Sequence, residues 1–288
     1  MLVKRLVTLA TVVATSGLLL GAAFVGTAGA ASASAGTSKP IPGGPIIRAP
    51  GGAGSAAGTG LPTISLNWSG YAATSAKKFN YVHTQFVQPE ISCTGARNRW
   101  TSNWTGLDGF TTGTVEQTGT FGLCGGPAHK TPVYEAWYEM YPAGSVNVFK
   151  VAPGDVINAT VKYTAGKFVI TIADVTSGKS ATVSAACSSC QRASAEWIIE
   201  RPALCNTALT NCFLTALANF GTTTMGQAKA RVAGGSIRPI GTFSNVPIFM
   251  VDPLKSGGFI SLDTVGALNG PSFSVVWNRS GTITPITL

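Results

Sequence analysis

The sequence predicts an all-β protein: an antiparallel β-sandwich of two large sheets, of the concanavalin-A-like or jelly-roll type, with very little helix. Short runs rich in Val, Thr, Ile and aromatic residues recur along the chain, separated by turn residues. Only 11% of the 288 residues are charged, against a usual ~25%. Residues 63–288 are long enough to form one β domain with a single core.

The N-terminus has the pattern of a secretory signal peptide. Lys4 and Arg5 precede an apolar run over residues 6–25, and small residues follow up to Ala30. We expect cleavage after Ala30, so that residues 1–30 are removed and the protein is secreted, without membrane association. A transmembrane anchor is the alternative, because the run is close to the length of a membrane span.

Residues 31–62 are rich in Ala, Gly, Ser and Pro. Such a stretch buries too little apolar surface to offset its ordering entropy, which predicts a flexible leader or pro-segment. The sandwich domain is then residues 63–288, with ordered structure expected from about Ile64.

Alternating apolar and polar residues, stopped by Gly or Pro, predict the strands. The segment 115–119 is also strand-like, and turns at Thr164–Gly166 and Thr176–Gly178 predict meander hairpins. One short helix is expected near Asn211–Asn219. The other expected strands cover residues 66–72, 82–87, 100–107, 133–141, 156–163, 167–175, 181–186, 194–201, 248–251, 259–262 and 273–277.

Six cysteines in an exported chain indicate disulfides. Cys205 and Cys212 enclose a short loop and are expected to pair with each other. Three pairings stay open for Cys93, Cys124, Cys187 and Cys190. A zinc site at Cys187–Cys190 is the alternative, but zinc would need two further ligands, and the only histidines, His83 and His129, are distant in sequence. We therefore expect no metal.

The net charge of +9 raises the question of nucleic acid. The basic residues are scattered, without a Lys/Arg run or a basic aromatic module, which argues against nucleic-acid binding. No stretch matches Gly-x-x-x-x-Gly-Lys-Ser/Thr, so no phosphate cradle and no cofactor is expected. The charge is expected to keep an exported protein soluble.

The sequence leaves carboxylate chemistry as the catalytic option. It has no Gly-x-Ser-x-Gly elbow, and its cysteines are expected in disulfides. Of only 11 acidic residues, four lie in two tryptophan-bearing runs: Glu135, Glu139, Glu196 and Glu200. A glutamate can act as general base on water, and an amide beside it can stabilise an oxyanion. Gln117 with Glu200 would meet both needs.

Several motifs between Asn67 and Phe220 occur in the order of a known family. They are Asn67-Trp-Ser-Gly70, Trp104-Thr-Gly-Leu-Asp-Gly109, Gln117-Thr-Gly119, Glu135-Ala-Trp-Tyr-Glu139 with Tyr141-Pro142, and Ala195-Glu-Trp-Ile-Ile-Glu200. With these motifs the chain resembles the glutamic peptidases (eqolisins), as a secreted member of bacterial type. The family's local disulfide corresponds to Cys205–Cys212. The chain departs from the family at Phe121 and at Arg201-Pro202.

The resemblance implies an acid endopeptidase whose concave sheet binds an extended polypeptide. Glu200 would activate water and then protonate the leaving amine, and Gln117 would stabilise the tetrahedral oxyanion. We expect at least two of the four aromatic residues Trp68, Trp104, Trp137 and Tyr141 to line the cleft. Glu139 is expected to be a hydrogen-bonded supporting carboxylate. Asp108 would either cap its own turn or support the site.

Two alternatives to a peptidase remain. A glycosidase would use a carboxylate pair, Glu135 with Glu139 or Glu196 with Glu200. A lectin-like binding module would leave Gln117 and Glu200 apart. The partners we expect are polypeptide substrates, and the protein is expected to be a monomer.

Overall fold

The structure is a computed structural model that describes residues 39–41, 44–50, 62–206 and 211–287. The chain divides into two compact units, Met1–Ala35 and Gly36–Leu288. The first unit, and with it the predicted signal peptide, lies outside the described residues. In the described part of the chain, no helix has the length and apolar character needed to cross a membrane.

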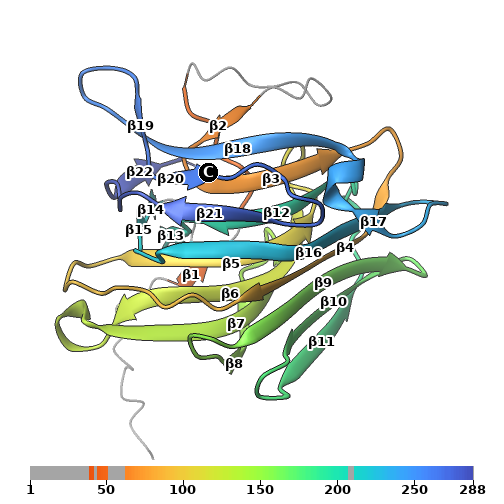
Figure 1. The fold of residues 1–288 in the computed structure, drawn as a ribbon, viewed down its shortest axis with the longest axis horizontal. Coiled ribbons are helices and arrows are strands. Elements are labelled where there is room, and N and C mark those ends of the chain that lie inside the picture. Colours follow the sequence, from red (N-terminus) through yellow and green to blue (C-terminus); the bar gives the residue numbers. More distant parts are fainter. Residues whose placement is uncertain (1–38, 42–43, 51–61, 207–210, 288) are drawn as a thin grey trace, which may run out of the picture. The chain divides into compact units, whose positions relative to one another are not determined.

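Two large, mostly antiparallel sheets make up the second unit (Figure 1). The ten-stranded sheet runs in the order β19 (Phe259–Ser261), β18 (Ser244–Pro253), β3 (Trp68–Thr74), β12 (Ser194–Glu200), β5 (Arg99–Leu107), β6 (Val115–Gly125), β7 (Thr131–Tyr141) and β8 (Val146–Lys150). At its side, β2 (Thr63–Ser65) pairs with β18, and β15 (Ala216–Leu217) pairs with β5. These strands carry all the motifs of the predicted site.

The eight-stranded sheet runs in the order β11 (Ser180–Ala185), β10 (Lys167–Asp174), β9 (Val156–Thr164), β4 (Phe79–Val87), β16 (Thr222–Val232), β21 (Phe273–Trp277) and β20 (Asp263–Val265), with β17 (Arg238–Pro239) on β16. A small sheet joins β1 (Lys39–Ile41), β13 (Ala203–Cys205), β14 (Cys212–Leu214) and β22 (Thr284–Ile286). The described helical turns are two 3-10 segments, Pro127–His129 and Ile240–Thr242.

The main core lies between the two large sheets. Because side chains alternate across a strand, residues such as Phe86 and Ile157 of one sheet meet Trp197 and Ile199 of the other. A second apolar cluster, which includes Trp104 and its neighbours, lies on the other face of the ten-stranded sheet. Strands β3 and β12 are therefore buried on both faces. The predicted all-β sandwich is confirmed.

One predicted element is wrong. The stretch Asn211–Asn219 was expected to hold a helix, but it forms β14 and β15, which pair with β13 and β5. Its apolar residues suit the period of a helix or of a strand, and pairing with strands distant in sequence decides the outcome.

Strands β8 and β16 lay outside the predicted set. The predicted hairpin at Thr164–Gly166 is confirmed, with positive φ at Ala165 and Gly166 as a two-residue hairpin turn requires.

All six cysteines lie in disulfides. Cys205–Cys212 forms as expected, joining the paired strands β13 and β14. The open pairings are Cys93–Cys124 and Cys187–Cys190. The Cys187–Cys190 bond also decides against the zinc alternative, because a disulfide sulfur is no longer the thiolate that zinc binds.

Candidate active site

The strand register places Gln117 and Glu200 on one face of the ten-stranded sheet. Glu200 on β12 lies opposite Ser102 on β5, and Gly106 on β5 lies opposite Gln117 on β6. Ser102 and Gly106 are four residues apart, so all four positions point the same way. Glu139 on β7 lies directly opposite Gln117 and shares this face.

Glu200 accepts hydrogen bonds from Trp104 and Asn67. The indole Nε1 of Trp104 donates to its Oε2 at 2.7 Å, and Nδ2 of Asn67 lies 3.4 Å from its Oε1. The carboxylate is 1% exposed. Its orientation therefore depends on two side chains from β5 and from the residue just before β3.

Gln117 is oriented by Glu139. Its Nε2 donates to Oε2 of Glu139 at 2.8 Å, and both residues are fully buried. Burial, and then the charge of Glu200, raise the pKa of Glu139 well above its usual range. The two carboxyl groups are thus close enough to interact, and burial together with the charge of Glu200 favours the protonated form of Glu139.

Gly119 on β6 makes room for the backbone and Cβ of Trp104 on the neighbouring strand. A Cβ at this position would lie 2.1 Å from the carbonyl oxygen of Asn103 and 2.5 Å from Cβ of Trp104. No side chain fits there without moving backbone. The glycine of the Gln-Thr-Gly motif thereby allows Trp104 to reach Glu200.

The predicted aromatic residues gather on the same face. Trp68 and Trp104 pack edge to face with ring centroids 4.9 Å apart, and both join Trp137 in the second apolar cluster. All three indoles are fully buried, while Tyr141 is half-buried. Of these residues Trp104 bonds to the Glu200 carboxylate and Trp68 lies opposite Glu200 in the register, and the three indoles are covered in this structure.

Part of the predicted leader provides that cover. Ile46 belongs to the aromatic cluster, and its N–H donates to the carbonyl of Gly109 at 3.2 Å. The Asn67 side chain accepts from the N–H of Ile47 at 2.7 Å and donates to the carbonyl of Pro45 at 3.2 Å. The sequence predicted a flexible leader over residues 31–62. In the structure, residues 44–50 of that stretch instead form specific hydrogen bonds to the face that carries Glu200.

Asp108 does not belong to this group. Its carboxylate accepts the backbone N–H groups of Gln191, Arg192 and Ala193 at 2.9, 2.6 and 2.8 Å. It has positive φ, 71°, and holds the loop between β11 and β12. Asp108 was predicted either to cap its own turn or to support the site. The structure shows a different role, in which Asp108 anchors the loop of residues 191–193.

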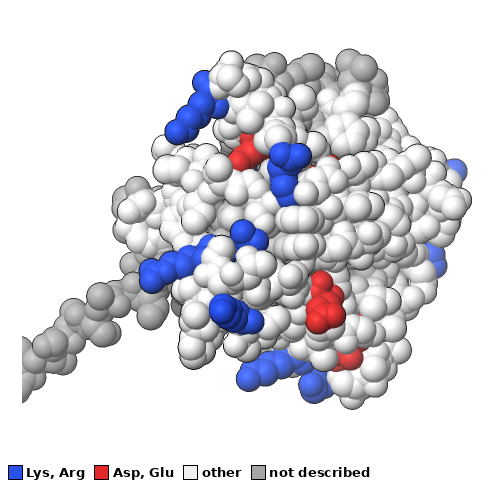
Figure 2. All heavy atoms as spheres, turned by 60° about the vertical axis from the view of Figure 1, so that its left-hand side comes forward, with Lys and Arg blue, Asp and Glu red and all other residues white. Residues whose placement is uncertain are grey.

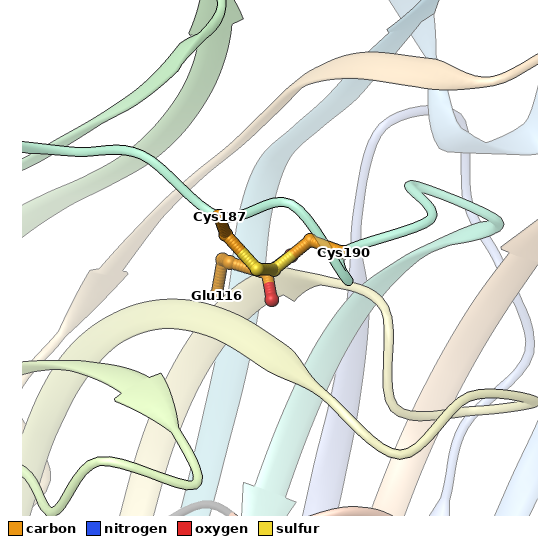
Figure 3. Close-up of side chains that lie close together, drawn as sticks. All are labelled: Glu116, Cys187 and Cys190. Carbon is orange, nitrogen blue, oxygen red and sulfur yellow. A yellow bond between two sulfur atoms is a disulfide. The ribbon is translucent and has the colours of Figure 1, made fainter.

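A second set of buried carboxyl groups lies near this loop. Glu116 packs against the Cys187–Cys190 disulfide (Figure 3). Burial and the nearby Asp108 raise its pKa to about 9. Burial, followed by the charges of Asp108 and Glu116, also raises the pKa of Glu196. Because the sulfurs are bonded to each other, the three side chains of Figure 3 have no thiolate to offer a metal ion.

The remaining candidate carboxylates have other partners. Glu135 is half-exposed and accepts a hydrogen bond from Asn147 on β8. Arg201, next to Glu200, forms a buried ion pair with Asp252, with Nη2 and Oδ1 2.8 Å apart. Arg201, at which the chain departs from the family pattern, is thus paired with an acidic residue on β18.

Sequence reasoning missed Asn67 as a site residue. The residue opens the Asn-Trp-Ser-Gly motif, but only the fold shows that its side chain joins Glu200 to the leader. The residues are 133 positions apart in the chain. The Asn-Trp-Ser-Gly motif was the available signal for Asn67, but it gave no indication that Asn67 contacts Glu200.

A β-sandwich whose buried face holds a carboxylate, an oriented amide and three indoles has the parts of a peptidase that uses a glutamate. Residues 66–251 match the Peptidase A4 family. The chain belongs to this family, and it is a glutamic endopeptidase. The resemblance seen in the sequence is thereby confirmed.

Solved structures agree on the fold. Scytalido-glutamic peptidase bound to a peptide-based transition-state analogue is 22% identical, with a TM-score of 0.62 over 74% of this chain and 98% of that chain. SCP-B, an eqolisin in complex with the tripeptide Ala-Ile-His, is 21% identical, with a TM-score of 0.60 over the same shares. At these identities the likeness concerns the fold alone. A search of curated proteins finds no match.

Proposed function

We propose that the chain is a secreted acid endopeptidase in which Glu200 acts on water as general base and then as general acid, and Gln117 stabilises the tetrahedral oxyanion. The observation that carries this assignment is the shared face of the ten-stranded sheet, on which Glu200 of β12 and Gln117 of β6 lie and Gln117 bonds to Glu139 of β7. Three disulfides support an oxidising, extracellular location.

Glu200 supplies the base. Trp104 and Asn67 fix both of its oxygens, so the carboxylate presents one orientation to an attacking water. Glu200 takes a proton from the water as its oxygen attacks the scissile carbonyl carbon. It then returns that proton to the amine nitrogen as the C–N bond breaks.

Gln117 supplies the oxyanion donor. A primary amide has two N–H bonds, and Glu139 accepts one of them, which sets the direction of the other. Because burial raises the pKa of Glu139, this neighbour is neutral in acid and adds no negative charge beside the developing oxyanion. The pair therefore favours catalysis at acidic pH.

The leader supports an extended polypeptide as substrate. The side chain of Asn67 bonds to the main-chain carbonyl of Pro45 and the main-chain N–H of Ile47, as a neighbouring strand would. An extended segment of chain therefore fits beside Glu200 through contacts that do not depend on its side chains.

The proposal is tested by hydrolysis of a denatured protein at acidic pH. Glu200→Gln should lower kcat by about 10³-fold, within the range for general acid–base catalysis. Gln117→Ala should lower it by ~10²–10³-fold, as for loss of an oxyanion donor. Glu135→Gln is the matched control, since Glu135 lies on the same sheet but bonds to Asn147. Full activity of either site variant would overturn the assigned roles.

Membership in a peptidase family favours peptide-bond hydrolysis over the glycosidase and lectin-like alternatives. The glycosidase alternative is checked in the same samples, by release of reducing ends from neutral polysaccharides. Its carboxylate pair would have to lie roughly 5–10 Å apart across a sugar. Release that is lost in both Glu135→Gln and Glu139→Gln, or in both Glu196→Gln and Glu200→Gln, would contradict the proposal.

A further inference from the structure

The outer face of the eight-stranded sheet carries an ordered array of polar and aromatic side chains. The register aligns Lys162, Tyr81 and Arg231 in one row across β9, β4 and β16. The next row aligns Thr160, His83 and Lys229 in the same way. We call these two rows, with Gln85, Asn158 and Gln227 beside them, the cationic face.

Hydrogen bonds between strands hold this array. Gln85 donates from Nε2 to Oδ1 of Asn158 at 3.0 Å and accepts from Nε2 of Gln227 at 3.0 Å. Nδ1 of His83 lies 2.9 Å from the hydroxyl of Thr160. The amide and hydroxyl groups are therefore fixed in position before any ligand arrives.

Two half-buried aromatic rings lie in the middle of the array. Tyr81 and His83 lie nearly parallel, with centroids 6.4 Å apart and planes at 23°. The guanidinium of Arg231 lies 6.0 Å from the Tyr81 centroid and is held by Asn80, which accepts from Nε at 2.8 Å. Aromatic rings flanked by amides and cations are suited to a sugar ring that carries a carboxylate.

The charge distribution favours an anionic partner. Eight of the eleven acidic residues are buried, and they are Asp108, Glu116, Glu139, Asp174, Glu196, Glu200, Asp252 and Asp263. None of the outward positions of β4, β9, β10, β11 and β16 is acidic. A face that only needed hydration would carry charges of both signs. On the face drawn in Figure 2, the basic side chains are separated by uncharged surface.

We propose that the cationic face binds an acidic oligosaccharide of the polyuronate class. Sugar rings lie on Tyr81 and His83, the amides of Gln85 and Asn158 bond to hydroxyl groups, and Lys162, Lys229 and Arg231 bind carboxylates. The face belongs to the other sheet from Gln117 and Glu200, so this binding is separate from peptide hydrolysis. It would hold the enzyme on an acidic polysaccharide.

Calorimetric titration of the full chain with a short oligogalacturonate tests the proposal. Wild type should bind, and Lys162→Gln with Lys229→Gln should weaken binding by about tenfold, since two exposed ion pairs are lost. Tyr81→Thr should also weaken it, because one of the two aromatic rings is removed. The matched control is Lys130→Gln with Lys255→Gln, which changes the net charge equally on loops of the other sheet. The control should bind like wild type, and hydrolysis of a soluble peptide should be unchanged in all variants.

Four outcomes would overturn the proposal. They are an absence of oligogalacturonate binding, an equal loss in the control variant, equal binding of the fully methyl-esterified oligosaccharide, and tighter binding of single-stranded DNA or anionic lipid vesicles. The ester isolates the carboxylate contribution, because it keeps the sugar rings and removes the charge. Loss of peptide hydrolysis with binding intact would concern the catalytic proposal alone.

Discussion

The outer faces of the two large sheets are built from the same alternating strands but hold opposite chemistry. On the ten-stranded sheet, Gln117, Glu139 and Glu200 are buried beneath aromatic residues and part of the leader. On the eight-stranded sheet, Lys162 and its neighbours remain in contact with water. The alternation of residues along a strand is therefore not enough to shift the pKa of a carboxyl group. The pKa shifts where other segments cover the group and exclude water from it.

The largest expected contrast is in pH dependence. Burial raises the pKa of Glu116 from 4.5 to about 9 and that of Asp263 from 3.8 to about 7, and it also raises those of Glu139 and Glu196. The folded state thus binds more protons than the unfolded state above about pH 4. The free energy of unfolding should fall as pH rises towards 9, by at most about 1.4 kcal/mol per pH unit for each group.

Denaturant titrations at pH 5, 7 and 9 measure this slope. Burial lowers the pKa of His83, which opposes the decline below pH 6.5, so the decline should be clearest above that value. Glu116→Gln should flatten the slope, whereas Glu90→Gln, at an exposed carboxyl group, should leave it unchanged. A protein equally stable at pH 7 and 9 would contradict the expectation.

Breaking the buried ion pair should cost more than any single change on the cationic face. Asp252→Asn leaves Arg201 charged and buried without its partner, which should lower the free energy of unfolding by about 3–5 kcal/mol. Lys162→Gln on the cationic face should change it by less than ~0.5 kcal/mol. Chemical denaturation measures the free energy of unfolding of both variants. Similar small losses would show that burial of the ion pair does not make it more important for stability than an exposed lysine.

The loop anchor should have an intermediate effect. Asp108→Asn keeps one acceptor oxygen but loses charge-assisted bonds to the backbone of residues 191–193, at a cost of about 1.5–3 kcal/mol. Hydrogen exchange of those amides should speed up more than exchange in β6. Unchanged protection at residues 191–193 would show that the disulfide alone holds the loop.

The smallest expected effect comes from uncovering the site face. A chain that begins at Pro62 lacks the segment bonded to Asn67, so its kcat/KM for a peptide should rise by about tenfold, as expected when a tethered competitor is removed. A synthetic peptide of residues 39–50 should reverse the gain. Equal activity of the full and shortened chains would show that the leader does not compete with substrate.

The sequence could predict strands wherever local pattern and tertiary environment agree. The run 133–141 alternates clearly and forms β7, and the glycine turn at 164–166 forms its hairpin. The pattern failed at Asn211–Asn219, where short apolar runs suit a helix or a strand equally. It also missed β16, whose bulge near Gly226 interrupts the alternation. In both places, pairing with distant strands made the decision.

The candidate site divides in the same way. The motifs singled out Gln117 and Glu200, and the alternation of side chains along a strand points Glu200 and Arg201 to opposite faces. This alternation cannot say which strand lies next to which. The bond from Glu139 to Gln117 and the contact between Asn67 and Glu200 depend on that neighbourhood. For the same reason the motif did not reveal that Asp108 bonds to the backbone of residues 191–193.

By itself, the sequence determined the all-β class, the local Cys205–Cys212 disulfide, the family and the two residues proposed for catalysis. These follow from short-range patterns, which a strand's period and a motif's spacing preserve. Only the tertiary structure decided which carboxyl groups are buried, that Glu139 orients Gln117, and that the leader lies beside Glu200. The physical reason is that burial and hydrogen bonding are set by the register of strands far apart in the chain.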